Sequence, residues 1–112
     1  MEIAEAIEIV EKYLLDEEVE INNFGSALPG YVNPNIKLQI LHDYTKEYDF
    51  GWVFLYNSTK YIETGDYRET LLGNAPLIFN KESKEIIVTG AADDVSYYVN
   101  NYIKTGDPHN EG

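Results

Sequence analysis

Three carboxylates in the segment "ETGDYRETLLGN" are the residues best suited to chemistry: Glu63, Asp66 and Glu69. They follow an aromatic-rich apolar segment, and glycoside hydrolysis uses two carboxyl groups held a few ångströms apart. Acidic residues are abundant throughout the chain, however, so the same cluster fits a solvated surface loop. We favour the loop, and a small hydrolase ranks last among the functions considered.

No other pattern in the sequence points to catalysis or to a metal. The histidines, His42 and His109, are far apart in the chain, and a zinc site there would need carboxylates to complete it. The serines lie in no nucleophile motif. Gly65 and Gly73 are not followed by the Gly-Lys-Ser/Thr of a phosphate-binding loop. We therefore expect no enzyme activity, no catalytic residue, no metal and no cofactor.

The chain carries a strong negative charge. Twenty Asp and Glu residues against eight Lys and Arg give a net charge of -12. Nucleic acids and anionic membranes are bound through basic clusters, so we expect neither as a partner, whereas a basic protein is favoured. No stretch approaches the roughly 20 apolar residues of a membrane span. Glutamates near the start argue against a signal peptide, and cysteine is absent. These features predict a cytoplasmic protein.

The elements that position these residues can be predicted from hydrophobic periodicity. The chain of 112 residues is 44% hydrophobic, which fits one domain. Residues 2–15 repeat apolar side chains at helical spacing. The acidic residues 16–18 are expected to face solvent at the start of a loop, with a short strand near residues 19–21.

Four strands are predicted in the middle of the chain. They span residues 36–40, 50–58, 76–80 and 85–90. The second is apolar on both faces, so we place it centrally and expect Trp52 to be buried. Residues 46–49 are interpreted as a turn. Lys84 occupies a hairpin position that usually takes a left-handed residue such as glycine.

A second helix is predicted after the strands. It begins near Asp93 as N-cap and stops at Gly106. The last six residues, 107–112, are expected to be disordered, which leaves residues 1–106 as the single domain. The fold class is α+β, with a mainly antiparallel sheet of about four strands and both helices packed on one face of it.

Ten tyrosines make a protein interface plausible on composition alone, because tyrosine is enriched at interfaces. Tyr48 and Tyr61 flank predicted strands, and Tyr67 lies within the acidic segment. Together with the three carboxylates of that segment, they form the predicted partner-binding set: Tyr48, Tyr61, Glu63, Asp66, Tyr67 and Glu69.

Several motifs in combination resemble the immunity protein 35 family, also called YrhB-like. They are Gly51 with Trp52; Glu63, Thr64, Gly65 and Asp66; Gly73, Asn74, Ala75 and Pro76; Gly90; and Tyr98 with Tyr102. The resemblance covers about residues 50–103, and the first helix is consistent in position. Asp94 departs from the family pattern, where a proline often opens the last helix, and Lys84 stands where a glycine often turns the hairpin.

The resemblance implies a protein of bacterial polymorphic toxin systems that binds a toxin made by its own cell and blocks it without catalysis. It implies structural roles for the motif residues Gly51, Trp52, Gly65, Gly73, Asn74, Pro76 and Gly90. The acidic segment then becomes a structured cover over the sheet whose rim faces the partner. The alternative is a general protein-binding or chaperone-like housekeeping factor with the same fold.

Overall fold

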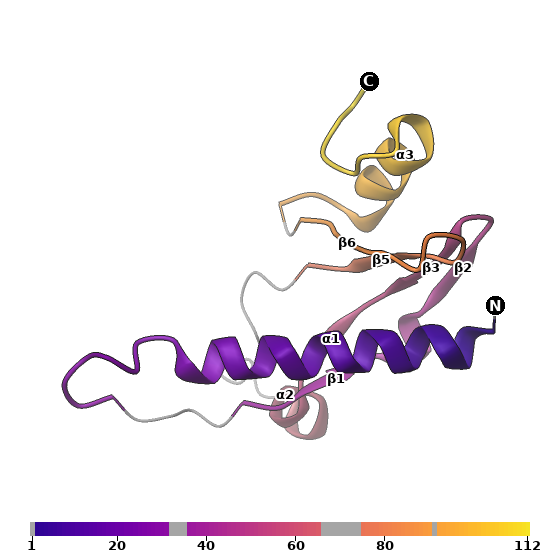
Figure 1. The fold of residues 1–112 in the computed structure, drawn as a ribbon. Coiled ribbons are helices and arrows are strands. Elements are labelled where there is room, and N and C mark those ends of the chain that lie inside the picture. Colours follow the sequence, from indigo (N-terminus) through magenta and orange to yellow (C-terminus); the bar gives the residue numbers. More distant parts are fainter. Residues whose placement is uncertain (1, 32–35, 66–74, 91) are drawn as a thin grey trace.

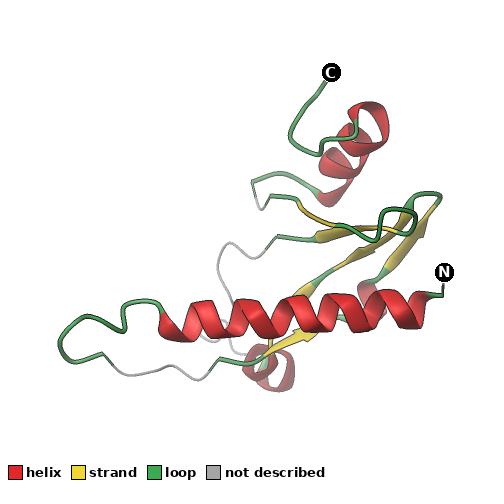
Figure 2. Cartoon of the chain, viewed as in Figure 1, coloured by secondary structure: helices red, strands yellow, loops and turns green. Residues whose placement is uncertain are grey.

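The computed structural model describes residues 2–31, 36–65, 75–90 and 92–112. The elements follow in the order α1 (Ile3–Asn23), β1 (Leu38–Ile40), a 3-10 turn η1 (His42–Tyr44), β2 (Lys46–Tyr48), β3 (Gly51–Phe54), β4 (Tyr56–Ser58), α2 (Thr59–Thr64), β5 (Leu77–Asn80), β6 (Ile86–Val88) and α3 (Val95–Thr105). Figure 2 shows helices and strands mixed in one molecule, and the α+β prediction is confirmed. The described strands form two antiparallel sheets, β2-β3-β5-β6 and β1-β4.

The four-stranded sheet is covered on both faces. All four residues of β3 are buried. Trp52 and Phe54 point to one face and belong to the core cluster that contains Ala6, Val10 and Leu14 of α1. The other face carries Val53 and Ile78, which form a separate cluster with Val99 of α3. Trp52 is buried, as predicted.

The prediction that both helices lie on one face of the sheet is therefore wrong. Figure 1 shows α1 below the sheet and α3 above it, so the molecule has three layers. The reason lies in β3, because successive side chains of a strand point to opposite faces. A strand that is apolar on both sides needs a cover on each side.

Helix α1 is longer than predicted and ends at Asn23. Residues 19–21 are helical rather than a strand. Glu18, expected in solvent, is only 7% exposed, because one of its carboxylate oxygens accepts a 2.6 Å hydrogen bond from the N–H of Leu38. One turn further on, the side chain of Asn22 bonds both the N–H and the carbonyl of Ile36, at 2.6 and 3.0 Å.

The second half of α1 and the turn after it project beyond the sheets (Figure 1). The radius of gyration is 15.2 Å. A compact domain of this length would have about 13 Å. The turn is closed by backbone hydrogen bonds from Ser26 to Asn23 and from Leu28 to Gly25, each of 2.9 Å. We call residues 15–31 the arm.

Two local predictions in the middle of the chain are also corrected. Residues 46–48, interpreted as part of a turn, form the edge strand β2, which pairs with β3. The segment after β4 forms a short helix, α2, whose N-cap Ser58 accepts a hydrogen bond from the N–H of Tyr61. Lys84 does adopt the predicted left-handed conformation, with φ of 60°.

The C-terminal helix begins one residue later than predicted, with Asp94 as N-cap, and stops at Gly106 as predicted. The last residues were expected to be disordered, but the structure places them against the body. Asn101 donates a 3.0 Å hydrogen bond to the carbonyl of the buried Pro108. His109 lies 3.1 Å from the carbonyl of Val88 on the edge strand β6. Polar contacts hold this segment, and an apolar pattern does not reveal them.

Candidate partner-binding surfaces

Half of the predicted partner-binding set lies outside the described residues: Asp66, Tyr67 and Glu69. Gly73 and Asn74 of the structural set lie outside them as well. Of the remaining three, Tyr61 and Glu63 are on α2, and Tyr48 ends β2. The structure does not gather these three residues at one site, since Tyr48 and Tyr61 line different pockets and Glu63 lines neither.

Tyr61 lines a pocket of about 520 Å³ between α2, β4 and the 3-10 turn η1. Its walls are mostly apolar and aromatic, with Leu41, Tyr44, Ile62 and Tyr56 among them. Gly65 and Pro76 line it too, so the two family-like motifs "ETGD" and "GNAP" meet at this pocket. Burial, and then the nearby Glu17, raise the pKa of Tyr56, which keeps its phenol neutral. A pocket of this kind suits an apolar group of a ligand or a partner.

Tyr48 contributes to a second pocket, of about 640 Å³, beside the C-terminal end of α3. Its ring stacks on Phe50 with centroids 5.1 Å apart, and Phe50 in turn meets Tyr102 edge to face at 5.0 Å. The hydroxyl of Tyr102 accepts a 2.8 Å hydrogen bond from Asn80. These aromatic side chains therefore fix the β2-β3 turn against α3.

The described motif residues occupy positions where backbone geometry matters. Gly51 has φ of 146°, and a Cβ there would collide with the backbone oxygen of Phe79 on β5. Gly90 lies under the ring of Tyr98. The carbonyl of Pro76 accepts hydrogen bonds from both the N–H and the hydroxyl of Thr89, at 3.1 and 2.6 Å.

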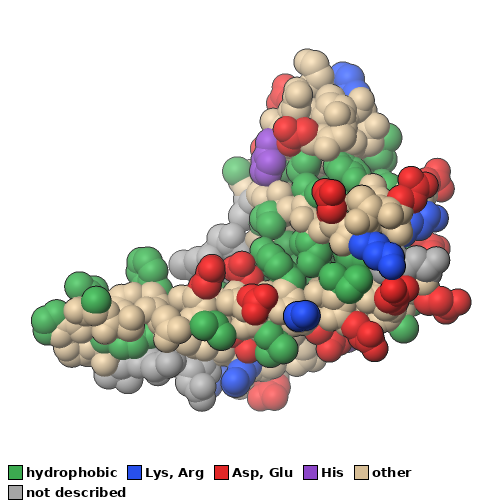
Figure 3. Space-filling view, in the orientation of Figure 1, with side chains coloured by type: hydrophobic (Ala, Val, Ile, Leu, Met, Phe, Trp, Pro, Cys, Tyr) green, Lys and Arg blue, Asp and Glu red, His purple; other side chains and the backbone are tan. Residues whose placement is uncertain are grey.

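Sequence reasoning missed an exposed apolar surface on the arm. Leu15 and Val19 are each 59% exposed, Phe24 is 86% and Leu28 is 66% exposed. Leu15 and Val19 lie one turn apart, on a different side of α1 from the buried Leu14. The signal was present as i, i+4 spacing, but it was hidden because the predicted helix ended at Leu15. Figure 3 shows hydrophobic side chains on the arm and acidic ones along α1.

The described residues form neither a cluster of metal ligands nor a membrane-spanning helix. Among them, no three His, Cys, Asp or Glu side chains come close enough to hold a metal ion. In the same part of the chain, every helix is too short or too polar to cross a membrane. The described residues do form pockets, an acidic surface along α1 and a set of exposed apolar side chains.

Comparison with known proteins gives one family and one relative. The sequence model of a family described as Immunity protein 35 matches residues 4–102. A protein of Escherichia coli (strain K12), named "Uncharacterized protein YrhB", is 40% identical over 52 residues. That alignment covers 46% of this chain and 55% of the relative, so it spans little more than half of the relative's length. No solved structure matches the chain.

Proposed function

The chain belongs to the immunity protein 35 family, and from this premise we propose that it neutralises a toxin of its own bacterium by binding it in the cytoplasm. The observation that carries the proposal is the family match, which spans nearly all of the chain from residue 4 to residue 102. In this proposal the protein acts without catalysis, as a stoichiometric inhibitor.

The charge of the chain supports a protein partner of opposite sign. Toxins that attack nucleic acids are usually basic, because they must approach phosphates. A net charge of -12 attracts such a protein and accelerates the encounter. The same charge disfavours nucleic acid as a direct ligand.

The exposed apolar side chains of the arm favour a second candidate, a chaperone-like factor that binds many unfolded proteins. The two candidates differ in specificity. An immunity protein recognises one folded toxin, whereas a chaperone-like protein accepts apolar segments of many chains.

Growth rescue separates these functions. A candidate toxin domain, chosen from the genes that neighbour this one, is expressed from an inducible promoter in a laboratory bacterium, with or without the full chain. We expect the toxin domain to stop growth and the chain to restore it, while a toxin domain from an unrelated system is not neutralised. Failure to restore growth would overturn the proposed function. Equal protection against unrelated toxins would favour the chaperone-like alternative.

A further inference from the structure

The arm exposes several apolar side chains. A helix whose only role is to cover a sheet has no need of apolar side chains on its exposed side. Helix α1 already buries Ala6, Val10 and Leu14 against the sheets. Leu15 and Val19 lie on another side of the same helix and contribute nothing to that core. Several exposed apolar side chains on one projecting element are typical of an interaction site, whereas single ones are ordinary.

The surroundings of Leu15 and Val19 are strongly acidic. Residues 1–20 contain eight acidic residues and one base, Lys12. Exposed carboxylates of α1 surround the apolar pair: Glu8, Glu11, Asp16 and Glu20. Two copies of this surface would repel each other, and an anionic membrane would repel it as well. Charge complementarity therefore selects a basic protein as the occupant.

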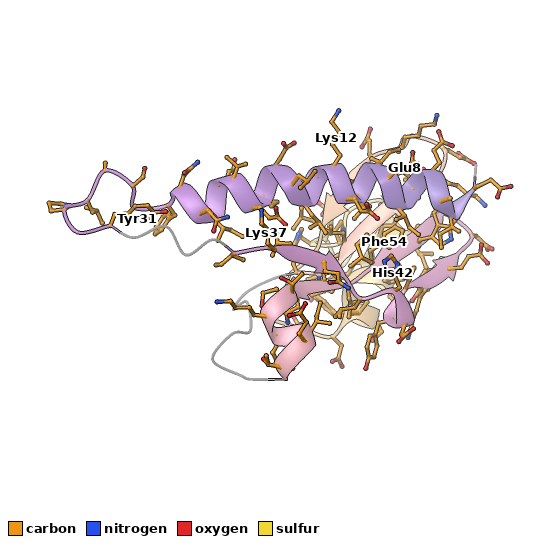
Figure 4. All side chains as sticks on the ribbon, turned by 90° about the horizontal axis from the view of Figure 1, so that it is seen from below. Glu8, Lys12, Tyr31, Lys37, His42 and Phe54 are labelled. Carbon is orange, nitrogen blue, oxygen red and sulfur yellow. The ribbon has the colours of Figure 1, made fainter. Side chains whose placement is uncertain are left out.

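A groove of about 380 Å³ adjoins this surface, between α1 and β1. Figure 4 shows these two elements running side by side. Leu14, Leu15 and Ile40 form apolar parts of the groove, and the carboxylates of Glu11 and Glu18 line it too. The hydrogen bond from Leu38 fixes the Glu18 carboxylate in place. A carboxylate can accept several hydrogen bonds, so capacity for another donor remains.

Apolar walls combined with carboxylates match one kind of side chain. Lysine and arginine bury an aliphatic stem while their charged head pairs with an acid. The groove lies between a helix and a strand, so its shape is already formed. Binding therefore does not lose free energy by ordering a flexible loop of this chain.

We propose that the face of α1 formed by Glu11, Leu15 and Val19, with the adjoining groove at Glu18, is the surface on which the toxin docks. A lysine or arginine of the toxin enters the groove, and an apolar patch of the toxin covers Leu15 and Val19. We call this surface the docking face. The proposal deepens the proposed function and rests on it.

Binding kinetics with purified proteins test the docking face. The probe is the candidate toxin domain that the chain neutralises in the growth assay, immobilised on a biosensor, with the full chain in solution. Leu15→Ser with Val19→Ser should raise Kd by about tenfold or more, mainly through faster dissociation, since these side chains form the apolar centre. Glu18→Gln keeps an acceptor for Leu38 but removes the charge, so it should weaken binding while lowering the melting temperature less than Glu18→Ala does.

Two matched controls separate this face from general surface effects. Ile103→Ser removes an apolar side chain that is 63% exposed on α3, and Glu82→Lys reverses an exposed charge in the β5-β6 connection. Both should bind within about twofold of the wild type, because uninvolved surface positions contribute little. Glu11→Lys, by contrast, should slow association and weaken its dependence on salt, because screening lengths fall from about 10 Å at 0.1 M to about 3 Å at 1 M.

The outcomes distinguish the inference from the proposed function. If the wild type binds and the docking-face variants bind equally well, the docking face is wrong and the toxin sits elsewhere. Loss of binding in Tyr61→Ala alone would then move the site to the pocket beside α2. If the wild type itself does not bind the toxin domain, the proposed function fails, and the docking face fails with it.

Discussion

The carboxylate of Glu18 on α1 accepts a 2.6 Å hydrogen bond from the backbone N–H of Leu38 on β1. The N–H of Leu41 donates to the carbonyl of Leu55, and the carbonyl of Lys37 accepts from the N–H of Thr59; Leu55 and Thr59 flank β4. Because hydrogen-bonded and non-hydrogen-bonded positions alternate along an antiparallel pair, the N–H of Leu38 points away from β4. Glu18 therefore supplies the partner that the strand pairing does not, and it ties the base of the arm to the β1-β4 ladder.

Removing this acceptor should destabilise the protein. Glu18→Ala leaves the N–H of Leu38 without its acceptor, at an expected loss of about 1–3 kcal/mol in the free energy of unfolding. Glu18→Gln retains an acceptor and should lose less. The exposed Glu20→Ala serves as the control, with an expected change within about 0.5 kcal/mol. Urea denaturation measures all three, and equal stability of Glu18→Ala and Glu20→Ala would contradict the role given to this bond.

Trp52 should be the most sensitive large side chain of the sheet. It lies buried between β3 and α1, with its ring 6.2 Å from that of Phe79. Trp52→Ala leaves a cavity and should lower the free energy of unfolding by about 3–5 kcal/mol. Thermal denaturation is the measurement, with Ile103→Ala on the exposed side of α3 as control. A melting temperature within a few degrees of the wild type would show that the core is not centred on this residue.

Two glycines with positive φ should respond differently to alanine. At Gly51 a Cβ collides with the carbonyl of Phe79 on the neighbouring strand, so Gly51→Ala must displace backbone. Gly65 has φ of 68° at the end of α2, and nothing lies within 4 Å of a Cβ there. Gly65→Ala should therefore cost only the left-handed conformation, about 1–2 kcal/mol. Denaturation curves should place Gly51→Ala well below Gly65→Ala, and the reverse order would refute this comparison.

Stability at high pH should depend on Tyr13. Burial, followed by the charge of Glu17, raises its pKa from 10.0 to about 12. The neutral phenol is thus favoured in the folded state, and its contribution is complete below pH 10. It is lost as the pH rises from about 10 to about 12, because the unfolded state ionises over this range while the folded state stays neutral. The stability of the wild type relative to Tyr13→Phe, measured by denaturation across this window, should fall with rising pH. A constant difference would argue against the shift.

Local chemistry made several features predictable. Lys84 takes the left-handed conformation because the tight connection between β5 and β6 requires it, whatever residue stands there. Gly106 likewise takes the left-handed conformation, in its case at the end of α3. The apolar alternation of β3 identified the central strand, and its two apolar faces already implied two covering layers. The error was to place both helices on one side.

The features that were missed depend on contacts distant in sequence. Glu18 looked like part of an exposed acidic run, because its partner Leu38 lies 20 residues away. The sequence therefore predicts a helix that stops at residue 15, and the spacing of the exposed pair Leu15 and Val19 lies across that predicted end. Strand β2 is short, polar and at the edge of its sheet, so it carries no hydrophobic pattern. Helix α2 did leave a signal, with Ser58 three residues before Tyr61 and Gly65 at its end.

The most direct test of neutralisation by binding is a calorimetric titration of the purified candidate toxin domain, chosen from the genes that neighbour this one, with the full wild-type chain. Neutralisation by binding predicts a single saturable transition at an equimolar ratio, with full loss of toxicity only when that ratio is reached. No heat of binding, or a toxin silenced by far less than an equimolar amount of the chain, would contradict it.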